Sequence, residues 1–396
     1  MTDPAQLADA AAGERAAYLH IPFCHRQCPY CDFAVVDLAE RPMSVDRYVD
    51  ALVAEIAMEP SWEPLDAVNL GGGTPSLLDA GQIHRILNIL DERFGLTPGA
   101  EISIEANPED WTADHAAAVR EAGVNRVSLG VQSFDQKVLS ALGRVHDPET
   151  GFAAVENSRA AGFDNVNLDL IFGTPGESVD SWRRTVAAAV DLQTDHLSAY
   201  ALTVELGTTL SRQIRDGAPA PLEDDLADKY ESLVADLPSR FGHYEVSNWA
   251  TDGKECRYNL TTWAQGEYVA FGLGAHGHRR GVRRRNVRRL DVYLEAIEAG
   301  RRPEAGSEHL TAWDREKERV FLGLRRRSGV RAGAAGGALL DSDGGQRLVA
   351  AAVVHVENGR LVVVRPLLTD AVAREVLDLD EPAPGWDVLS LSPDEC

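Results

Sequence analysis

Hydrophobic residues in the first half of the chain follow two alternating patterns, short apolar runs and longer stretches with a helical period. The short runs predict six buried strands, over 17–21, 67–70, 101–105, 126–131, 165–172 and 196–204. Between them, apolar residues recur every three or four positions, which predicts helices over 45–58, 80–94, 112–122, 150–161 and 178–192. Strands that alternate with helices favour parallel βαβ units with right-handed crossovers.

Polar and glycine-rich residues follow most of these predicted strands. A cysteine-rich loop comes after the first strand, and the later ones run into 71–75, 105–108, 130–134 and 173–176. In an open parallel sheet and in a (β/α) barrel alike, ligands gather at the carboxyl ends of the strands. We therefore predict an α/β fold with an active-site rim at that end of the sheet.

The regular alternation stops after about residue 205. Helical stretches over 222–237 and 290–299 enclose a segment rich in aromatic residues, histidine and glycine, which is typical of a ligand-facing extension. Beyond residue 305 we predict a helix over 313–327, a flexible Ala/Gly stretch over 332–339 and a hairpin that turns at 357–359. The predicted organisation is a leader (1–14), the α/β unit (15–215), an extension (216–304) and a small winged-helix-like domain (305–396).

Composition is that of a soluble globular protein, with 44% hydrophobic and 26% charged residues among 396. No apolar run approaches the roughly 18 residues of a membrane span, and the polar N-terminus lacks the basic segment of a secretory signal. Five cysteines, three of them clustered, favour the reducing cytoplasm. We expect a cytoplasmic protein without a membrane span, for which contact with a membrane surface stays open.

The net charge of −23 disfavours general binding to nucleic acid, because an acidic molecule repels the phosphate backbone. One local exception is a cluster of seven arginines within eleven residues: Arg279, Arg280, Arg283, Arg284, Arg285, Arg288 and Arg289. It could receive a carboxylate-bearing ligand such as a tetrapyrrole. It could equally be a solvated patch that pairs with acidic neighbours.

Cys24, Cys28 and Cys31 form a C-x3-C-x2-C pattern on one tight loop. Three thiolates can hold three corners of an iron–sulfur cube and leave the fourth iron open to a small molecule. Zinc is the alternative, with His20, His25 or Cys256 as a fourth ligand, although the chain lacks a second C-x2-C pair. An odd number of cysteines disfavours a disulfide framework.

The cysteine loop resembles that of the radical S-adenosylmethionine (SAM) superfamily. With the motifs at 71–75, 105–108, 130–134, 142–147, 167–176 and 272–278, the chain resembles the branch that holds oxygen-independent coproporphyrinogen oxidase and the heme chaperone HemW family. The resemblance implies a partial (β/α)6 barrel, a 4Fe-4S cluster on the three cysteines, and SAM bound at the open iron. In that superfamily the cluster cleaves SAM to a deoxyadenosyl radical, so the cofactor carries the chemistry.

The resemblance also implies roles for residues at the strand ends. Two tyrosines flank the cluster loop and the adenosyl group, glycines let the backbone approach the methionyl amino group, and polar side chains hold the zwitterion and the ribose. The SAM-binding set is Tyr18, Tyr30, Gly72, Gly73, Thr74, Glu105, Gln132, Arg144 and Asp169. Taken singly, the glycines suit a tight turn and the acids suit a helix cap or a salt bridge.

One departure from the branch concerns the residue after the loop. Coproporphyrinogen oxidases carry a fourth cysteine two positions after the third, where this chain has Phe33. The chain therefore resembles the chaperone members, and porphyrinogen oxidation by a radical SAM oxidoreductase is the alternative. We assign no catalytic residue.

A second departure concerns heme. The chaperone family carries His-Asn-x3-Trp, and the matching segment here runs from Tyr258-Asn259 to Trp263, with tyrosine in the place of histidine. Tyrosinate can ligate ferric heme, so Tyr258 is one candidate ligand, and His276 and His278 are the others. All three could instead be structural residues.

Together with the patterns above, the resemblance implies a heme chaperone that binds a 4Fe-4S cluster, SAM and heme. The predicted partners are a heme-accepting protein and an electron donor.

Overall fold

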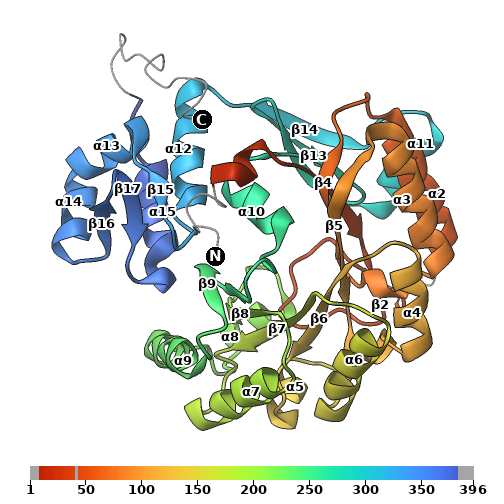
Figure 1. Cartoon of the computed structure of the whole chain (residues 1–396), viewed down its shortest axis with the longest axis horizontal. Coiled ribbons are helices and arrows are strands. Elements are labelled where there is room, and N and C mark those ends of the chain that lie inside the picture. Colours follow the sequence, from red (N-terminus) through yellow and green to blue (C-terminus); the bar gives the residue numbers. More distant parts are fainter. Residues whose placement is uncertain (1–8, 41–42, 382–396) are drawn as a thin grey trace.

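The structure, a computed structural model, describes residues 9–40 and 43–381 (Figure 1). Its body is a 12-stranded sheet in the order β14-β13-β12-β11-β1-β4-β5-β6-β7-β8-β10-β9. The six predicted strands are consecutive parallel neighbours at its centre: β1 (Arg15–Ile21), β4 (Leu65–Gly72), β5 (Leu96–Ala106), β6 (Arg126–Gln132), β7 (Val166–Phe172) and β8 (His196–Ala201). The predicted α/β class is confirmed.

Helices join these strands where the apolar period predicted them, and the short α5 is an addition. They are α2 (Val45–Met58), α3 (Ala80–Phe94), α4 (Ala113–Glu121), α5 (Gln136–Ala141), α6 (Pro148–Ala160) and α7 (Val179–Asp191), with 3-10 turns η2 (Pro75–Leu77) and η3 (Pro108–Asp110). Five of the six begin behind a side chain that accepts a hydrogen bond from the backbone N–H three residues on: Ser44, Asp79, Thr112, Asp147 and Ser178. Such caps satisfy amides that a helix start leaves unpaired.

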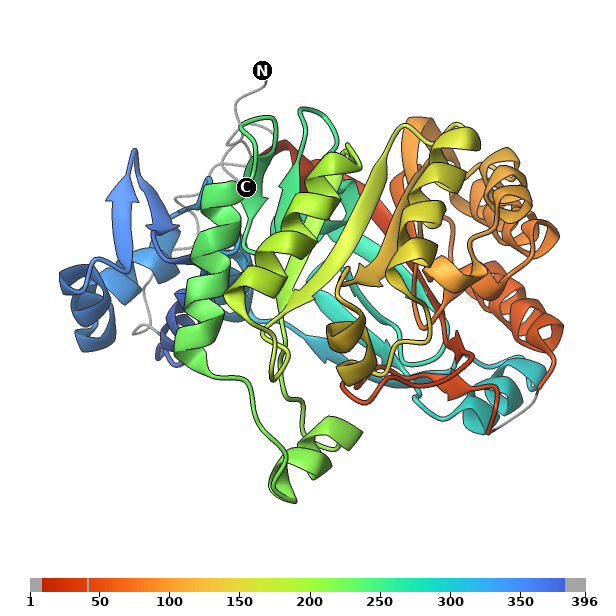
Figure 2. The ribbon, with the colours of Figure 1, turned by 90° about the horizontal axis from the view of Figure 1, so that it is seen from below.

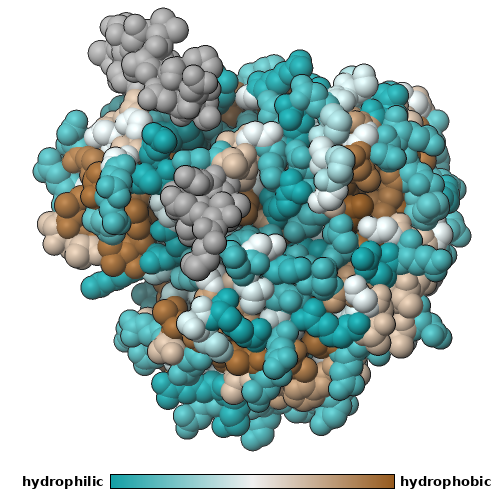
Figure 3. Space-filling model, viewed as in Figure 1, coloured by the Kyte–Doolittle hydropathy of each residue, from teal (hydrophilic) through white to brown (hydrophobic). Residues whose placement is uncertain are grey.

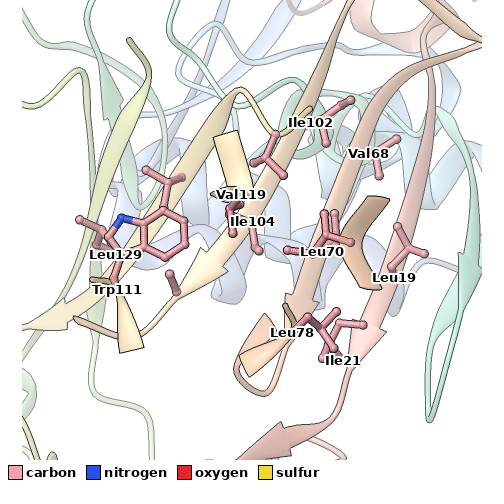
Figure 4. Packing of buried hydrophobic residues seen from close by; sticks show 14 of the residues in the cluster. Leu19, Ile21, Val68, Leu70, Leu78, Ile102, Ile104, Trp111, Val119 and Leu129 are labelled. Carbon is pink, nitrogen blue, oxygen red and sulfur yellow. The ribbon is translucent and has the colours of Figure 1, made fainter. Parts of the chain in front are cut away.

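The strands separate an apolar face from a polar one. Apolar side chains such as Leu70 and Ile104 pack towards the helices with Trp111 and Val119 (Figure 4). Because successive strand residues point to opposite faces, Asn69 and Glu105 turn to the other side of the sheet. That side is a polar concavity, and it positions the site described below.

The extension adds strands to both edges of this sheet. On one edge β11 (Glu267–Phe271) pairs in parallel with β1, and β12 (His276–Arg279), β13 (Val282–Asn286) and β14 (Glu304–His309) follow in antiparallel order. On the other edge β10 (Asn248–Ala250) and β9 (Gly242–Glu245) follow β8. The helices of this part are α8 (Thr209–Arg215), α9 (Glu223–Asp236), α10 (Arg257–Trp263) and α11 (Leu290–Glu298). The segment with α8 stands out from the body in Figure 2.

The C-terminal part has a core of its own, built around Val320, Leu361 and Val372. It contains α12 (Ala312–Gly323), α13 (Gly333–Asp341), α14 (Asp343–Ala350), η4 (Pro366–Leu368), α15 (Thr369–Leu377) and the sheet β15-β17-β16 (Val330–Arg331, Arg360–Val363, Val354–Glu357). The stretch expected to be flexible, 332–339, is instead mostly helix α13. Alanine favours helix, and Ala335 and Leu339 are buried in this core. Exposed apolar side chains gather on this part of the surface (Figure 3).

The first eight residues of the predicted leader lie outside the described residues. Residues 382–396, which include Cys396, lie outside them as well. The described end of the leader is anchored, because Ala11 is buried in η1 (Ala11–Gly13) and Asp9 pairs with Arg360 at 3.0 Å. The other domain boundaries stay predictions. Within the described residues, no helix combines the length and the apolar character that a membrane crossing requires.

Candidate functional site

The cysteine loop leaves the sheet at the carboxyl end of β1 and is held closed by backbone contacts. Its start, β2 (Phe23–Cys24), pairs with β3 (Val36–Asp37), and Leu38 N–H donates to Cys24 O at 2.9 Å. Asp37 accepts the N–H of Gln27 at 3.0 Å. These contacts shape the loop, and all three cysteines on it are free, half-buried thiols.

Two opposing effects act on the pKa of the loop thiols. Burial raises the pKa of Cys24 and of Cys31 to about 11. At Cys24 the hydroxyl of Thr74, 3.5 Å from Sγ, and the charge of Arg144 oppose this rise in pKa. Arg144 Nη1 also lies 3.6 Å from Cys28 Sγ. Among the described residues, no group of three His, Cys, Asp or Glu side chains is arranged to hold a single metal ion.

The three cysteines line a cavity of about 500 Å³ on the polar side of the sheet, which we call the cysteine cavity. Eight of the nine predicted SAM-binding residues line it as well: Tyr30, Gly72, Gly73, Thr74, Glu105, Gln132, Arg144 and Asp169. Tyr30 comes from the cysteine loop and Asp169 from the middle of β7, and the others come from the carboxyl ends of β4 to β6 and the segments that follow them. These eight candidates therefore lie in one cavity, and their roles in SAM binding stay predictions.

Two partly buried acids face one side of this cavity. Glu105 Oε2 accepts the N–H of Gly72 at 3.0 Å, and burial together with nearby Asp169 raises the pKa of Glu105 to about 7. Asp169 accepts hydrogen bonds from Ser128 at 2.6 Å and Asn167 at 2.9 Å, and burial raises its pKa too. Such a pair suits a ligand that brings a positive charge and hydroxyl donors.

Backbone geometry accounts for the glycines and singles out Gln132. Gly72 has φ +110°, and a Cβ there would lie 2.4 Å from His20 Nδ1. A Cβ on Gly73 would lie 2.7 Å from Phe23 O. Close packing against the cysteine loop therefore requires both glycines, in addition to any approach by a ligand. Gln132 has φ 67°, a strained conformation that clusters at functional sites.

Arg144 is buried between the cavity and the loop. Its Nη2 donates to Asn107 Oδ1 at 2.7 Å and to Gly130 O at 3.1 Å, so protein groups already engage much of the guanidinium. Its Nε is buried and finds no hydrogen-bond partner among the described residues. Asn107, which the sequence analysis did not single out, thus helps to fix the arginine beside the cysteines.

Tyr18, the ninth predicted SAM residue, lies elsewhere. It lines a second cavity of about 290 Å³ with Tyr258, Tyr268, His276 and Arg288, which we call the tyrosine cavity. Tyr18 stacks on Tyr258 at 5.9 Å between ring centroids, and its hydroxyl lies 3.0 Å from His20 Nδ1.

The two cavities are neighbours. The side chain of Phe33 lines both and is 58% exposed. Helix α10 and its cap residue also border both, with Cys256 and Asn259 on the cysteine cavity and Tyr258 on the tyrosine cavity. The residue that separates this chain from four-cysteine relatives thus lies at the boundary between the cavities.

The three heme candidates do not lie together. Tyr258 and His276 line the tyrosine cavity, and His278 does not. His278 is buried beside Tyr268 with Nδ1 3.2 Å from Gly266 O. Partial burial and the charges of Arg285 and Arg288 lower the pKa of His276, whereas burial raises the pKa of Tyr258 well above its usual range. At neutral pH His276 is therefore a neutral imidazole, the form that binds metals, and Tyr258 a protonated phenol.

The sequence analysis missed the residues deeper in the cysteine cavity. Strand β8 contributes His196, Ser198 and Tyr200, and β6 contributes Arg126 and Ser128. Each set alternates with apolar or small residues along its strand. This period-two polar pattern was a usable signal, because inward-facing side chains of a strand recur at every second position.

Most of the arginine cluster is a surface that pairs with acids. Arg279 lies 3.5 Å from Glu59, Arg283 2.9 Å from Glu308, Arg284 3.7 Å from Glu304 and Arg289 2.5 Å from Asp291. Arg288 differs, since its Nη2 donates to the backbone oxygen of Asp32 at 2.8 Å.

Comparisons with known proteins agree with this geometry. The family description "Radical SAM superfamily" matches residues 18–189. The chain is 43% identical to the heme chaperone HemW of Mycobacterium tuberculosis, over 91% of this chain and 94% of the relative. It is 36% identical to the heme chaperone HemW of Bacillus subtilis, over 80% and 84%. In fold it resembles the coproporphyrinogen III oxidase HemN of Escherichia coli, with a TM-score of 0.77, 24% identity, and 95% and 93% of the two chains covered.

Proposed function

Because the chain belongs to the family of the heme chaperone HemW, we propose that it binds heme and passes it to an acceptor protein. The observation that carries this proposal is the pair of neighbouring cavities that share Phe33. One is lined by three cysteines and two acids, and the other by aromatic rings, a neutral histidine and an arginine. The first suits an iron–sulfur cluster with SAM, and the second suits a flat anionic ligand.

Cys24, Cys28 and Cys31 would hold a 4Fe-4S cluster, whose chemistry would be one-electron reduction of the sulfonium of SAM. To bind iron, the thiols must lose their protons, which burial disfavours. At Cys24, the hydroxyl of Thr74 and the charge of Arg144 offset that cost. Three cysteines leave one corner of the cube without a protein ligand, where SAM binds.

In the cysteine cavity Glu105 holds the ammonium group of SAM, and Asp169 accepts from the ribose hydroxyls. Arg144 faces the carboxylate, although Asn107 and Gly130 O share its donors. The deeper walls of the cavity include the polar side chains of Ser128 and Ser198.

Heme binds in the tyrosine cavity, with His276 as the iron ligand. Tyr258 lies in the same cavity, but its raised pKa opposes the tyrosinate form that ligation needs. Tyr258 therefore packs against the ring, while Tyr18 supports it from behind. The protein acts in the cytoplasm, and its partners are a heme-accepting protein and an electron donor.

The test is anaerobic reconstitution with iron and sulfide, followed by heme titration with and without SAM. We expect four irons for each chain, saturable SAM binding and one heme for each chain. Stoichiometric zinc in place of a cluster, or no saturable heme binding, would contradict the proposal. Changing any one of the three loop cysteines to alanine should abolish stable iron binding. Cys256→Ala should retain it, because Cys256 is the cap residue of α10 and does not lie on the cysteine loop.

Oxidation of a porphyrinogen is the competing function, and Phe33 distinguishes it. Where four-cysteine relatives have a further thiol, this chain has an apolar ring at the boundary between the cavities. Incubation of the reconstituted protein with coproporphyrinogen III, SAM and a reductant should therefore yield no protoporphyrinogen IX. Robust conversion would replace the chaperone assignment with an enzymatic one.

A further inference from the structure

Arg288 differs from most of its arginine neighbours in what it contacts. Within residues 9–40 and 43–381 it forms no ion pair, and its guanidinium is held only by the bond from Nη2 to Asp32 O. It also lines the tyrosine cavity. Its charge lowers the pKa of both His20 and His276, which line the same cavity. Arg288 thus brings to that cavity a positive charge that no salt bridge among the described residues neutralises, although Asp32, whose backbone oxygen it contacts, also lines the cavity.

The same side chain touches the cysteine loop. Asp32 directly follows Cys31, so the oxygen that accepts from Arg288 belongs to the residue next to a cluster ligand. The segment before Arg288 is fixed as well, because Gly274 N–H donates to Val287 O at 2.9 Å. A Cβ on Gly274 would lie 3.0 Å from Ala34 Cβ and 3.4 Å from Arg288 Cγ. Arg288 and the end of the cysteine loop are therefore packed as one unit.

We propose that Arg288 binds a carboxylate of the ligand in the tyrosine cavity and thereby couples that ligand to the cysteine loop. The identity of the ligand, heme with its two propionates, rests on the proposed function. A guanidinium has five N–H donors in a planar fork, so it can keep Asp32 O on Nη2 and offer its remaining donors to a carboxylate.

The coupling is positive and reciprocal. A loaded cysteine loop holds Asp32 O in place and so orients the guanidinium before the carboxylate arrives, which reduces the cost of ordering on binding. By linkage, a bound carboxylate stabilises the same loop arrangement and strengthens retention of the cluster by the same factor. Couplings of this kind change affinity by about 5-fold to 150-fold.

The experiment measures the dissociation constant of heme for the full chain, once with the reconstituted cluster and once without it. In the unaltered protein we expect the cluster to tighten heme binding by at least about 5-fold. In Arg288→Ala we expect weaker heme binding. We also expect the ratio of the two dissociation constants, without and with the cluster, to be near one. Arg288→Lys should recover part of the affinity but little of the ratio, because an ammonium cannot serve both acceptors as a fork does. Arg289→Ala is the matched control, since its partner is Asp291 and it does not line the cavity.

A second probe separates carboxylate binding from a structural role. Heme whose propionates are esterified retains the ring and the iron but lacks the charges. Its affinity should be the same for the unaltered protein and for Arg288→Ala, and iron content should confirm that the variant retains the loop. Equal loss of affinity for both probes, or an unchanged ratio in Arg288→Ala, would overturn this proposal alone. Absence of heme binding by the unaltered protein would overturn the proposed function and this proposal with it.

Discussion

Glu105 is a partly buried acid whose pKa is raised well above that of a free carboxyl group. Burial and Asp169 raise its pKa to about 7, although Gly72 N–H stabilises the charged form. A carboxylate attracts an ammonium group, and a protonated acid does not. The role proposed for Glu105 therefore has a direct consequence for how SAM binding depends on pH.

We predict that SAM binding weakens as the pH falls through about 7, because Glu105 then gains a proton. Glu105→Gln should bind SAM more weakly at higher pH and lose most of this dependence. Calorimetric titration of the reconstituted protein at several pH values measures both effects. Glu121→Gln, an exposed acid at the end of α4, is the control and should behave as the unaltered protein. A pH dependence that survives in Glu105→Gln would assign the titrating group to another residue.

The axial ligand gives a second prediction at this scale. His276→Ala should shift the Soret band of the heme complex and weaken binding, because it removes the neutral imidazole from the tyrosine cavity. Tyr258→Phe should leave the band nearly unchanged, since it retains the stacking ring. His355→Ala, an exposed histidine of the C-terminal hairpin, controls for loss of a surface histidine. The opposite pattern would identify tyrosine as the ligand.

At the scale of elements, the buried carboxyl group of Glu55 connects α2 to the strands β11 to β13 and to α11. Glu55 accepts hydrogen bonds from Gly272 N–H at 2.8 Å, Asn286 Nδ2 at 2.6 Å and Tyr293 at 2.7 Å. These partners lie after β11, in β13 and in α11, which are far from α2 in the sequence. Despite the donors, burial raises the pKa of Glu55 to about 7.

This raised pKa predicts a stability effect with a definite sign. Between pH about 4.5 and 7 the folded state holds a proton that the unfolded state has lost, so the contribution of Glu55 to stability falls as the pH rises. Relative to Glu55→Gln, the unaltered protein should lose up to about 3 kcal/mol of unfolding free energy across this window, at about 1.4 kcal/mol per pH unit. Urea denaturation at several pH values measures the difference. A constant difference would show that Glu55 is ionised in the folded protein throughout.

The described residues form two large hydrophobic cores, one behind the large sheet and one within the C-terminal part, and a small third cluster around Val138 and Leu142 in the body. Leu70 lies in the first and Leu361 in the second, and both are fully buried. The site residues belong entirely to the body that the first core supports. The predicted domain division therefore has a thermodynamic test.

We predict that Leu361→Ala destabilises the C-terminal part by about 2–5 kcal/mol, the usual cost of a large-to-small core substitution. Hydrogen exchange should accelerate in residues 312–379, while SAM and heme affinities stay unchanged. Leu70→Ala should instead accelerate exchange in the sheet and weaken SAM binding, because β4 carries Gly72. Equal acceleration in both parts after Leu361→Ala would mean that the chain unfolds as one unit.

The sequence by itself determined the alternating elements and part of the lining of the cysteine cavity, whereas the deeper residues on β6 and β8 were missed. Apolar periods predicted α2 and α3 over their observed spans, because burial on one helix face leaves a local record in the chain. Parallel strands align their carboxyl ends, so eight of nine SAM candidates meet in one cavity. The winged-helix description and the individual site roles remain predictions.

Only the tertiary structure decided which residues share a cavity beyond those strand ends. β11 lies beside β1 although some 250 residues separate them, a pairing that no local pattern records. That pairing places Tyr268 and His276 in the same cavity as Tyr18. The family resemblance had predicted SAM binding for Tyr18. Packing of α10 adds Tyr258 to the same cavity, while His278 stays apart. Long-range strand pairing and side-chain direction set these neighbours, and both depend on the folded chain as a whole.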